Sequence, residues 1–119
     1  MSRKILVAED DAIVRSILKQ YLSLNGFVVI EEPSGLKVRE RVLEHKPEAC
    51  LIDIIMDVKE GIETIEEILS LPDRPKIIAI SSDSFYLSLA LELGADAILQ
   101  KPIEASSLQE TLKKLEIFN

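Results

Sequence analysis

The 119-residue chain carries 21 acidic and 14 basic residues, which gives a formal net charge of −7 at pH 7. This charge disfavours direct binding to nucleic acid, whose phosphates would be repelled. With 47% hydrophobic residues and no apolar run near the ~20 residues of a membrane span, the composition is typical of one soluble domain over residues 1–119. An apolar strand-like stretch follows the first residues directly, without a signal-peptide core, so we expect a cytoplasmic protein.

Short β-prone apolar runs alternate along the chain with segments that have apolar residues at helical spacing. The predicted strands cover residues 5–8, 27–30, 49–52, 76–80 and 97–99. The predicted helices cover residues 12–24, 36–44, 62–71, 85–93 and 104–115, and glycines at 26 and 94 end two of them. Continuous apolar strands that alternate with helices indicate a parallel sheet covered on both faces. The sequence therefore predicts a doubly wound α/β fold, whose ligands bind beyond the carboxyl ends of the strands.

Acidic residues follow the first and third predicted strands. Glu9, Asp10 and Asp11 come directly after the first strand, although Asp11 alone could serve there as a helix cap. Asp53 interrupts an apolar run that would otherwise be a central strand. A buried carboxylate without a partner is costly, so we expect Asp53 to have one. The alternative for Asp53 is an ordinary loop aspartate just past the end of the strand.

A parallel sheet with its first and third strands adjacent would bring Asp53 to Glu9 and Asp10. Repulsion among these carboxylates would raise their pKa values, and a hard divalent cation such as Mg²⁺ would relieve it. Ser81 and Lys101 follow the fourth and fifth strands at the same end. Taken singly, Ser81 could cap a helix and Lys101 could be a solvent-exposed side chain. Together they supply a hydroxyl and a compact positive charge for a phosphate, beside a carboxylate nucleophile.

The order of these motifs is similar to that of the receiver domains of two-component response regulators. The matching positions span the chain: Ile5 to Asp11, Asp53, Met56, Gly61, Ser81 and Lys101-Pro102. The resemblance implies a flavodoxin-like sheet of five parallel strands in the order 2-1-3-4-5. It also implies that the chain is a phosphoacceptor that catalyses its own phosphorylation and dephosphorylation, rather than a conventional enzyme.

The resemblance further implies a role for each residue of the site. Asp53 is the phosphoacceptor, and Ser81 and Lys101 contact the phosphoryl oxygens. The implied Mg²⁺ ligands are oxygen donors: Asp10, Asp53, the backbone carbonyl of Ile55, and Glu9 through water. The bond from Lys101 to Pro102 is implied to be cis.

The implied partner is a sensor histidine kinase or a phosphotransfer protein that presents a phosphohistidine. Phosphorylation adds about −1.5 to −2 charge, which we expect to draw the loop after the fourth strand toward Asp53. The fourth helix and the fifth strand would then report the change to an output partner or to a second copy of the chain.

Three positions depart from the family pattern. Asp57 stands where proline is usual, and Ile98 stands where an aromatic side chain is usual. The fourth predicted helix begins with Phe85, Tyr86 and Leu87, which we interpret as a partner or dimer surface unless one or two of them pack inward.

Two alternative functions follow from the same residues. The departures from the family pattern would suit a receiver-like interaction module that is not phosphorylated. A flavin-binding or hydrolytic α/β enzyme is compatible with the fold alone, but the sequence has neither a phosphate loop nor a nucleophile–base pair.

Overall fold

The computed structural model describes residues 3–55 and 58–118. Within these residues five strands alternate with five helices, as the sequence predicts. The strands are β1 (Lys4–Ala8), β2 (Val28–Glu32), β3 (Ala49–Asp53), β4 (Lys76–Ser81) and β5 (Ala97–Gln100). The helices are α1 (Ala12–Leu24), α2 (Val38–His45), α3 (Val58–Leu69), α4 (Ser84–Leu93) and α5 (Ala105–Lys114). None of the described helices is long and apolar enough to cross a membrane.

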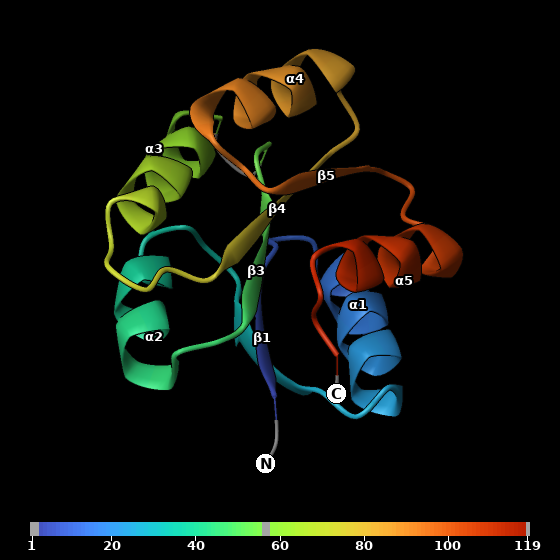
Figure 1. Cartoon of the computed structure of the whole chain (residues 1–119). Helices are drawn as coiled ribbons and strands as arrows, with labels where there is room; N and C mark the ends of the chain where they lie inside the picture. The colour runs from blue at the N-terminus through green and yellow to red at the C-terminus, as the bar shows by residue number, and fades with distance from the viewer. Residues whose placement is uncertain (1–2, 56–57, 119) are drawn as a thin grey trace.

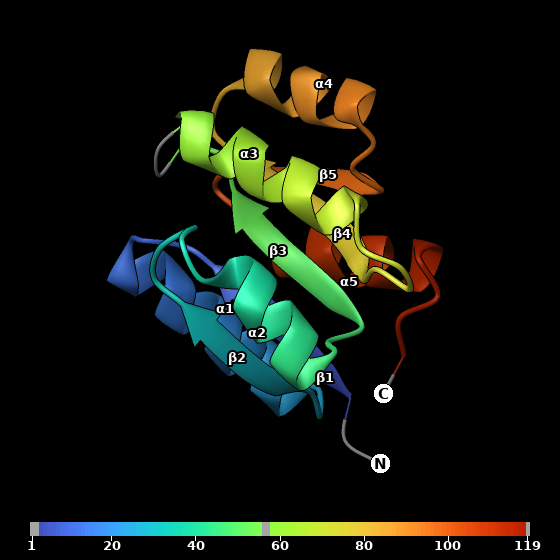
Figure 2. The same cartoon turned by 90° about the vertical axis from the view of Figure 1, so that its left-hand side faces the viewer.

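The strands form one sheet in the order β2-β1-β3-β4-β5, and each neighbouring pair is parallel. This order confirms the predicted fold class. Helices α1 and α5 cover one face of the sheet, and α2, α3 and α4 cover the other (Figure 1). In the view of Figure 2 the arrowheads of β2 and β3 point to the same side. All the strands therefore end at one common end of the sheet.

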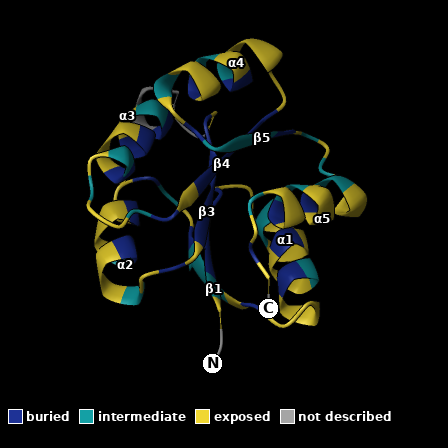
Figure 3. Cartoon of the chain, in the orientation of Figure 1, coloured by how far each residue is buried: buried dark blue, intermediate teal, exposed yellow. Residues whose placement is uncertain are grey.

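Two apolar clusters hold the helices to the sheet. Leu6 and Ala8 of β1 belong to the cluster under α2, α3 and α4, whereas Ile5 and Val7 belong to the cluster under α1 and α5. This division follows from strand geometry, because successive side chains point to opposite faces. Both faces are covered, so the three central strands β1, β3 and β4 are buried along most of their length, whereas the edge strands β2 and β5 are only partly buried and the outer faces of the helices are exposed (Figure 3).

Some element boundaries differ from the predicted ones. Strand β2 begins at Val28, because Phe27 donates its backbone N–H to Leu22 in the turn that closes α1. The strand continues through Glu31 and Glu32, which pair with the last residues of β1. Helix α3 covers Val58–Leu69 rather than 62–71. These shifts show that backbone pairing, rather than hydrophobicity alone, sets where an element begins and ends.

The apolar residues of α1 do not all face the sheet. Leu18 and Leu22 are buried, as helical spacing predicts, but Ile13 is 72% exposed and Ile17 is 60% exposed. Helices α1 and α4 end where predicted, next to Gly26 with φ 89° and at Gly94 with φ 119°. Both glycines adopt a left-handed conformation that other residues avoid. The exposed isoleucines leave an apolar strip on the first half of α1.

Candidate functional site

The chemically active side chains predicted from the sequence lie at the carboxyl-terminal end of the sheet. Glu9 and Asp10 directly follow β1, Asp53 is the last residue of β3, and Ser81 is the last residue of β4. Lys101 directly follows β5, and its backbone N–H donates to the carbonyl oxygen of Ser81 at 2.9 Å. The strand order 2-1-3-4-5 therefore places residues from four strands around one site.

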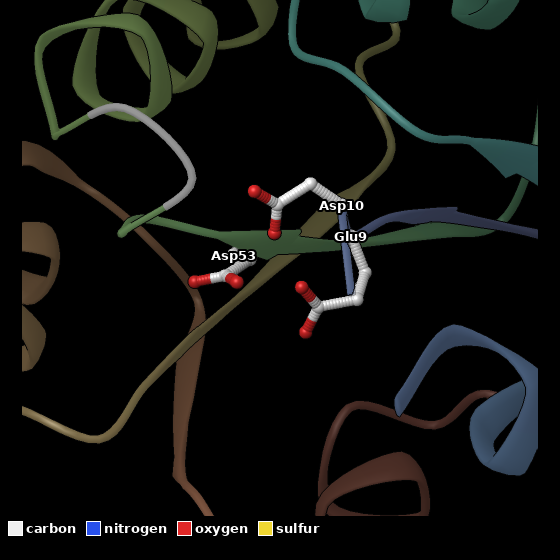
Figure 4. A group of neighbouring side chains, drawn as sticks. All are labelled: Glu9, Asp10 and Asp53. Atoms are coloured by element: carbon white, nitrogen blue, oxygen red, sulfur yellow. The ribbon is translucent and has the colours of Figure 1, made fainter. Parts of the chain in front are cut away.

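The carboxylates of Glu9, Asp10 and Asp53 form an acidic cluster. Their ligand oxygens lie within 4.8 Å of one another, and Figure 4 shows the three side chains gathered where β1 and β3 end. Glu9 is 0% exposed and Asp53 is 3% exposed, whereas Asp10 is exposed. Two buried carboxylates at this spacing need positive charge or protons to offset their repulsion.

Lys101 supplies the positive charge that Asp53 was expected to need. Its Nζ donates to Asp53 Oδ2 at 2.9 Å and also forms an ion pair with Glu9 Oε1. The second oxygen of Asp53, Oδ1, accepts the backbone N–H of Ile55 at 2.9 Å. Both oxygens of Asp53 thus have donors, so its carboxylate is held in a fixed orientation at the end of β3.

The pKa values of the two buried carboxyl groups shift in opposite directions. Burial raises the pKa of Glu9 to about 7, and the neighbouring Asp53 adds to that rise. Burial also acts to raise the pKa of Asp53, but hydrogen bonds with Glu9 and Lys101 outweigh it and lower the pKa. The expectation that repulsion raises the pKa is therefore wrong for Asp53, because hydrogen bonds with Glu9 and Lys101 stabilise its charged form.

Asp11 has a structural role. Its Oδ1 accepts the backbone N–H groups of Ile13 at 2.9 Å and Val14 at 3.3 Å, which caps the N-terminus of α1. Its own backbone N–H donates to Glu9 Oε2 at 3.2 Å. The acidic triplet therefore divides into one helix cap, Asp11, and two carboxylates that point into the cluster, Glu9 and Asp10.

The donor set of the cluster fits a hard divalent cation. All three side chains offer carboxylate oxygens, which Mg²⁺ prefers. Glu9 Oε1 is buried and accepts no hydrogen bond from any described residue; its polar contact is the ion pair with Lys101. A buried carboxylate oxygen whose polar contact is a single ammonium group can also bind a water molecule or a cation.

Ser81 and the start of α4 lie beside the cluster. Ser81 is buried, and its Oγ accepts the backbone N–H of Asp83 at 3.0 Å. Asp83, rather than Ser81, caps α4 by accepting the N–H of Phe85 at 2.9 Å. Ser81 is therefore not a helix cap, and its hydroxyl hydrogen can still donate to a ligand.

The predicted partner surface at the start of α4 is smaller than expected. Phe85 is 68% exposed and contacts Tyr86 edge to face, with ring centroids 5.4 Å apart. Leu87 is 3% exposed and belongs to the cluster under α4, so its assignment to an exposed patch is wrong. Ile98 and Tyr86 are half-buried against that cluster.

Other predicted features concern the loop after Asp53 and the residue after Lys101. Met56 and Asp57 lie outside the described residues, so the effect of Asp57 in place of proline stays a prediction. The bond from Lys101 to Pro102 is cis, the form that the resemblance implies.

An apolar hollow beside Lys101 is a feature that the sequence reasoning missed. It measures about 370 Å³ and lies between α1 and the segment after β5, lined by Val14, Ile17, Leu18, Ser82, Lys101, Pro102 and Ile103. The exposed Ile17 belongs to it, and Ile13 is one helical turn away. The available signal was the width of the apolar face of α1, because Ile13 and Ile17 lie on a different line from Leu18 and Leu22.

Comparisons with known proteins agree with this geometry. The model of the response regulator receiver domain family matches residues 5–113. The chemotaxis protein CheY of Bacillus subtilis is 32% identical over 118 residues, which cover 96% of this chain and 98% of that protein. The response regulator MprA of Mycobacterium ulcerans is 32% identical over 117 residues, but the chain spans only 50% of its length. The crystal structure of the BeF3-activated receiver domain of Klebsiella pneumoniae RstA superposes with a TM-score of 0.85 at 26% identity, covering 94% of this chain and 97% of that one.

Proposed function

Because this chain belongs to the family of response regulator receiver domains, we propose that it accepts a phosphoryl group on Asp53. The observation that carries the proposal is the setting of Asp53, which is almost fully buried at the end of a central strand beside Glu9 and Asp10. Its Oδ2 is held 2.9 Å from Lys101 Nζ. Receiver domains of response regulators act in phosphorelay signalling.

In the proposed transfer, an oxygen of Asp53 attacks the phosphorus of a phosphohistidine on a partner protein. The phosphorus–nitrogen bond breaks, its electron pair returns to the imidazole, and an acyl phosphate forms on Asp53. Lys101 is already in contact with this carboxylate and would offset the charge of the phosphoryl oxygens. Ser81 Oγ accepts from Asp83 and would donate its own hydrogen to one of them. Water later cleaves the acyl phosphate and restores the carboxylate.

For the metal site we propose Asp10, Asp53 and the backbone carbonyl of Ile55 as ligands of Mg²⁺, with Glu9 acting through water. The spacing of the three carboxylates and the buried Oε1 of Glu9 support this assignment. When bound, the ion supplies positive charge that offsets the charge of the phosphoryl group during transfer.

The proposed partner is a sensor histidine kinase or a phosphotransfer protein, and the apolar strip on α1 supports a docking position. Ile13 and Ile17 are exposed next to the hollow that Lys101 helps to line. A donor packed there would bring its phosphohistidine to the end of the sheet where Asp53 lies. For the output we propose the exposed Phe85 and the neighbouring Tyr86 and Ile98 as the surface read by a second copy of the chain or another partner.

Incubation with a small-molecule phosphodonor and Mg²⁺, followed by intact-protein mass spectrometry, tests the acceptor. We expect one added phosphoryl group in the parent chain and none in Asp53→Asn. Asp11→Asn is the matched control, because it removes a neighbouring acidic charge while asparagine still caps the helix. Labelling of Asp53→Asn at the parent rate would contradict the assignment. A parent that takes no label would instead favour an interaction module that is not phosphorylated.

A further inference from the structure

Arg15 lies in the first turns of α1, and its side chain is only 19% exposed. Its charge does not belong to the acidic cluster, and no motif in the sequence points to it. We propose that Arg15 is a positioning residue of the metal site, which fixes the loop between β1 and α1 so that Asp10 and Glu9 present their carboxylates together. This inference rests on the Mg²⁺ site of the proposed function.

The guanidinium of Arg15 binds the backbone of the two acidic residues. Its Nη1 donates to the carbonyl oxygen of Glu9 at 2.7 Å and lies 3.5 Å from the carbonyl oxygen of Asp10. Its Nε forms an ion pair with Glu31 Oε1 at 3.4 Å. Glu31 lies near the end of β2 and also binds Lys19 Nζ at 3.0 Å. Arg15 therefore connects the acidic loop to an edge strand of the sheet.

These contacts hold the peptide that joins Glu9 to Asp10. The backbone N–H of Glu9 donates to the carbonyl oxygen of Glu32 at 3.1 Å, and its carbonyl oxygen accepts from Arg15. Because a peptide unit is planar, a fixed carbonyl oxygen on Glu9 also fixes the nitrogen and Cα of Asp10. Asp10 is exposed, so its direction depends on this backbone anchor more than on packing.

The charge of Arg15 and its contacts with the acidic loop are expected to change the affinity for Mg²⁺ in opposite directions. A positive group near the cluster repels Mg²⁺, so its removal through charge alone would tighten binding. Loss of the anchor would weaken binding, because the Asp10 carboxylate would no longer be held beside Asp53. Lys19 separates the two effects, since it carries the same charge and contacts the same Glu31 but, among the residues that the structure describes, forms no hydrogen bond or ion pair with the acidic loop.

The experiment compares the Mg²⁺ dissociation constants of the parent chain, Arg15→Met and Lys19→Met by calorimetric titration. We expect Arg15→Met to bind Mg²⁺ about tenfold more weakly, as for other residues that orient metal ligands. Lys19→Met should bind as tightly as the parent or slightly more tightly. In phosphodonor assays, Arg15→Met should need more Mg²⁺ for half-maximal labelling but reach a parent-like rate at saturation.

Arg15→Met that binds Mg²⁺ as tightly as Lys19→Met would overturn the inference. If Arg15→Met does not fold, Arg15→Lys replaces it, because lysine keeps the charge but lacks the fork that joins Glu31 to the loop. Weakened binding by Arg15→Lys would support the positioning role, and parent-like affinity would overturn it. A parent chain that binds no Mg²⁺ would overturn the metal site of the proposed function itself, which is a separate result.

Discussion

The acidic side chains at the two ends of the sheet have opposite surroundings. At the carboxyl-terminal end, Glu9 and Asp53 are buried together and both contact a single lysine, Lys101. At the amino-terminal end, Asp96 accepts from Arg74 Nη1 at 2.9 Å and from the backbone N–H of Ile77 at 2.8 Å. The first arrangement gathers like charges around one cation, whereas the second pairs one acid with one base.

The pKa values follow this difference. Burial acts to raise the pKa of Asp96, but the Arg74 guanidinium and the Ile77 N–H outweigh it and keep the pKa below its ordinary value. Burial raises the pKa of Glu9 to about 7. A carboxyl group whose pKa is lowered stabilises the fold when it is charged, whereas one whose pKa is raised destabilises the fold when it is charged. Ionisation of Glu9 near neutral pH therefore opposes folding, and a cation bound at the cluster would offset that charge.

The largest expected effect is on Mg²⁺ binding when one carboxylate of the cluster is removed. Asp10→Ala should lower the affinity for Mg²⁺ about 10- to 100-fold, because it removes a ligand. In the absence of Mg²⁺ the same variant should resist urea better than the parent, since one of three repelling charges is gone. Calorimetric titration and urea unfolding measure the two effects. Parent-like affinity would contradict the assignment of Asp10 as a ligand, and a less stable Asp10→Ala without Mg²⁺ would contradict the repulsion within the cluster.

Removal of the acid at the other end should have the opposite effect on stability. Asp96→Ala should lose about 1.5–3 kcal/mol of unfolding free energy at pH 7, the usual value of hydrogen bonds to a charged group. The pKa of Asp96 in the folded chain lies below its ordinary value of 3.8. Its contribution is therefore fully present above that ordinary value and is lost as the pH falls through the lower folded value.

Urea unfolding of the parent and Asp96→Ala at steps from pH 7 to pH 3 measures this dependence. The difference in unfolding free energy between the two chains should be constant near neutral pH and should shrink in the acid range. A difference that does not change with pH would mean that Asp96 acts through packing rather than through its charge.

Gly61 gives a third test, because it lies where α3 approaches the segment after Asp53. A Cβ atom at position 61 would lie 2.7 Å from the carbonyl oxygen of Ile54, which is backbone and cannot turn aside. We expect Gly61→Ala to lose about 1–3 kcal/mol of unfolding free energy, as for other overpacked sites. It should also weaken Mg²⁺ binding, since the displaced segment carries Asp53 and Ile55.

The matched control is Gly94→Ala at the end of α4, where the φ of 119° makes alanine strained. It should lower the unfolding temperature but leave Mg²⁺ affinity unchanged, because Gly94 contacts Leu69 rather than the site. Equal losses of Mg²⁺ affinity in both variants would show that the site responds to global stability and not to the position of Ile54.

The strands and the place of the site were predictable because both depend on short-range patterns, whereas the strand order was implied only by the family resemblance. Apolar runs such as residues 49–52 identify buried strands, and polar residues directly after them must lie at the carboxyl-terminal end. Asp53, Ser81 and Lys101 were found in this way. The β2 boundary was missed because Phe27 is as apolar as a strand residue but closes the turn after α1.

The features that the sequence did not predict depend on contacts that form only in the folded chain. Arg15 gives no sequence signal, since its acceptors are backbone carbonyl oxygens, which every residue has. The opposite pKa shifts of Glu9 and Asp53 depend on the hydrogen bond between these two groups, which forms only when β1 and β3 lie side by side. The burial of Leu87 beside the exposed Phe85 likewise depends on the angle at which α4 rests on the sheet.

The smallest expected effect is a local change in the loop after β4 when Asp53 is phosphorylated. Ile98 is half-buried and has no ring that could move into the core, so it can change its burial only slightly. The hydrogen bonds that hold the loop include those from Asp83 N–H to Ser81 Oγ at 3.0 Å and from Gln100 Nε2 to the Ser82 carbonyl oxygen at 3.3 Å.

Charge-assisted hydrogen bonds from Ser81 and Lys101 to a phosphoryl group, each about 1.5–3 kcal/mol, are strong enough to shift such a loop. Amide hydrogen exchange with and without a phosphoryl mimic should therefore show altered protection over residues 81–91 and a smaller change over 96–101. Asp53→Asn treated with the same mimic is the control and should show neither change. Unaltered protection over 81–91 in a chain whose Asp53 is demonstrably occupied would mean that the signal leaves through another surface. The exposed Phe85 would then be an ordinary surface residue, and the start of α4 would have no part in the readout.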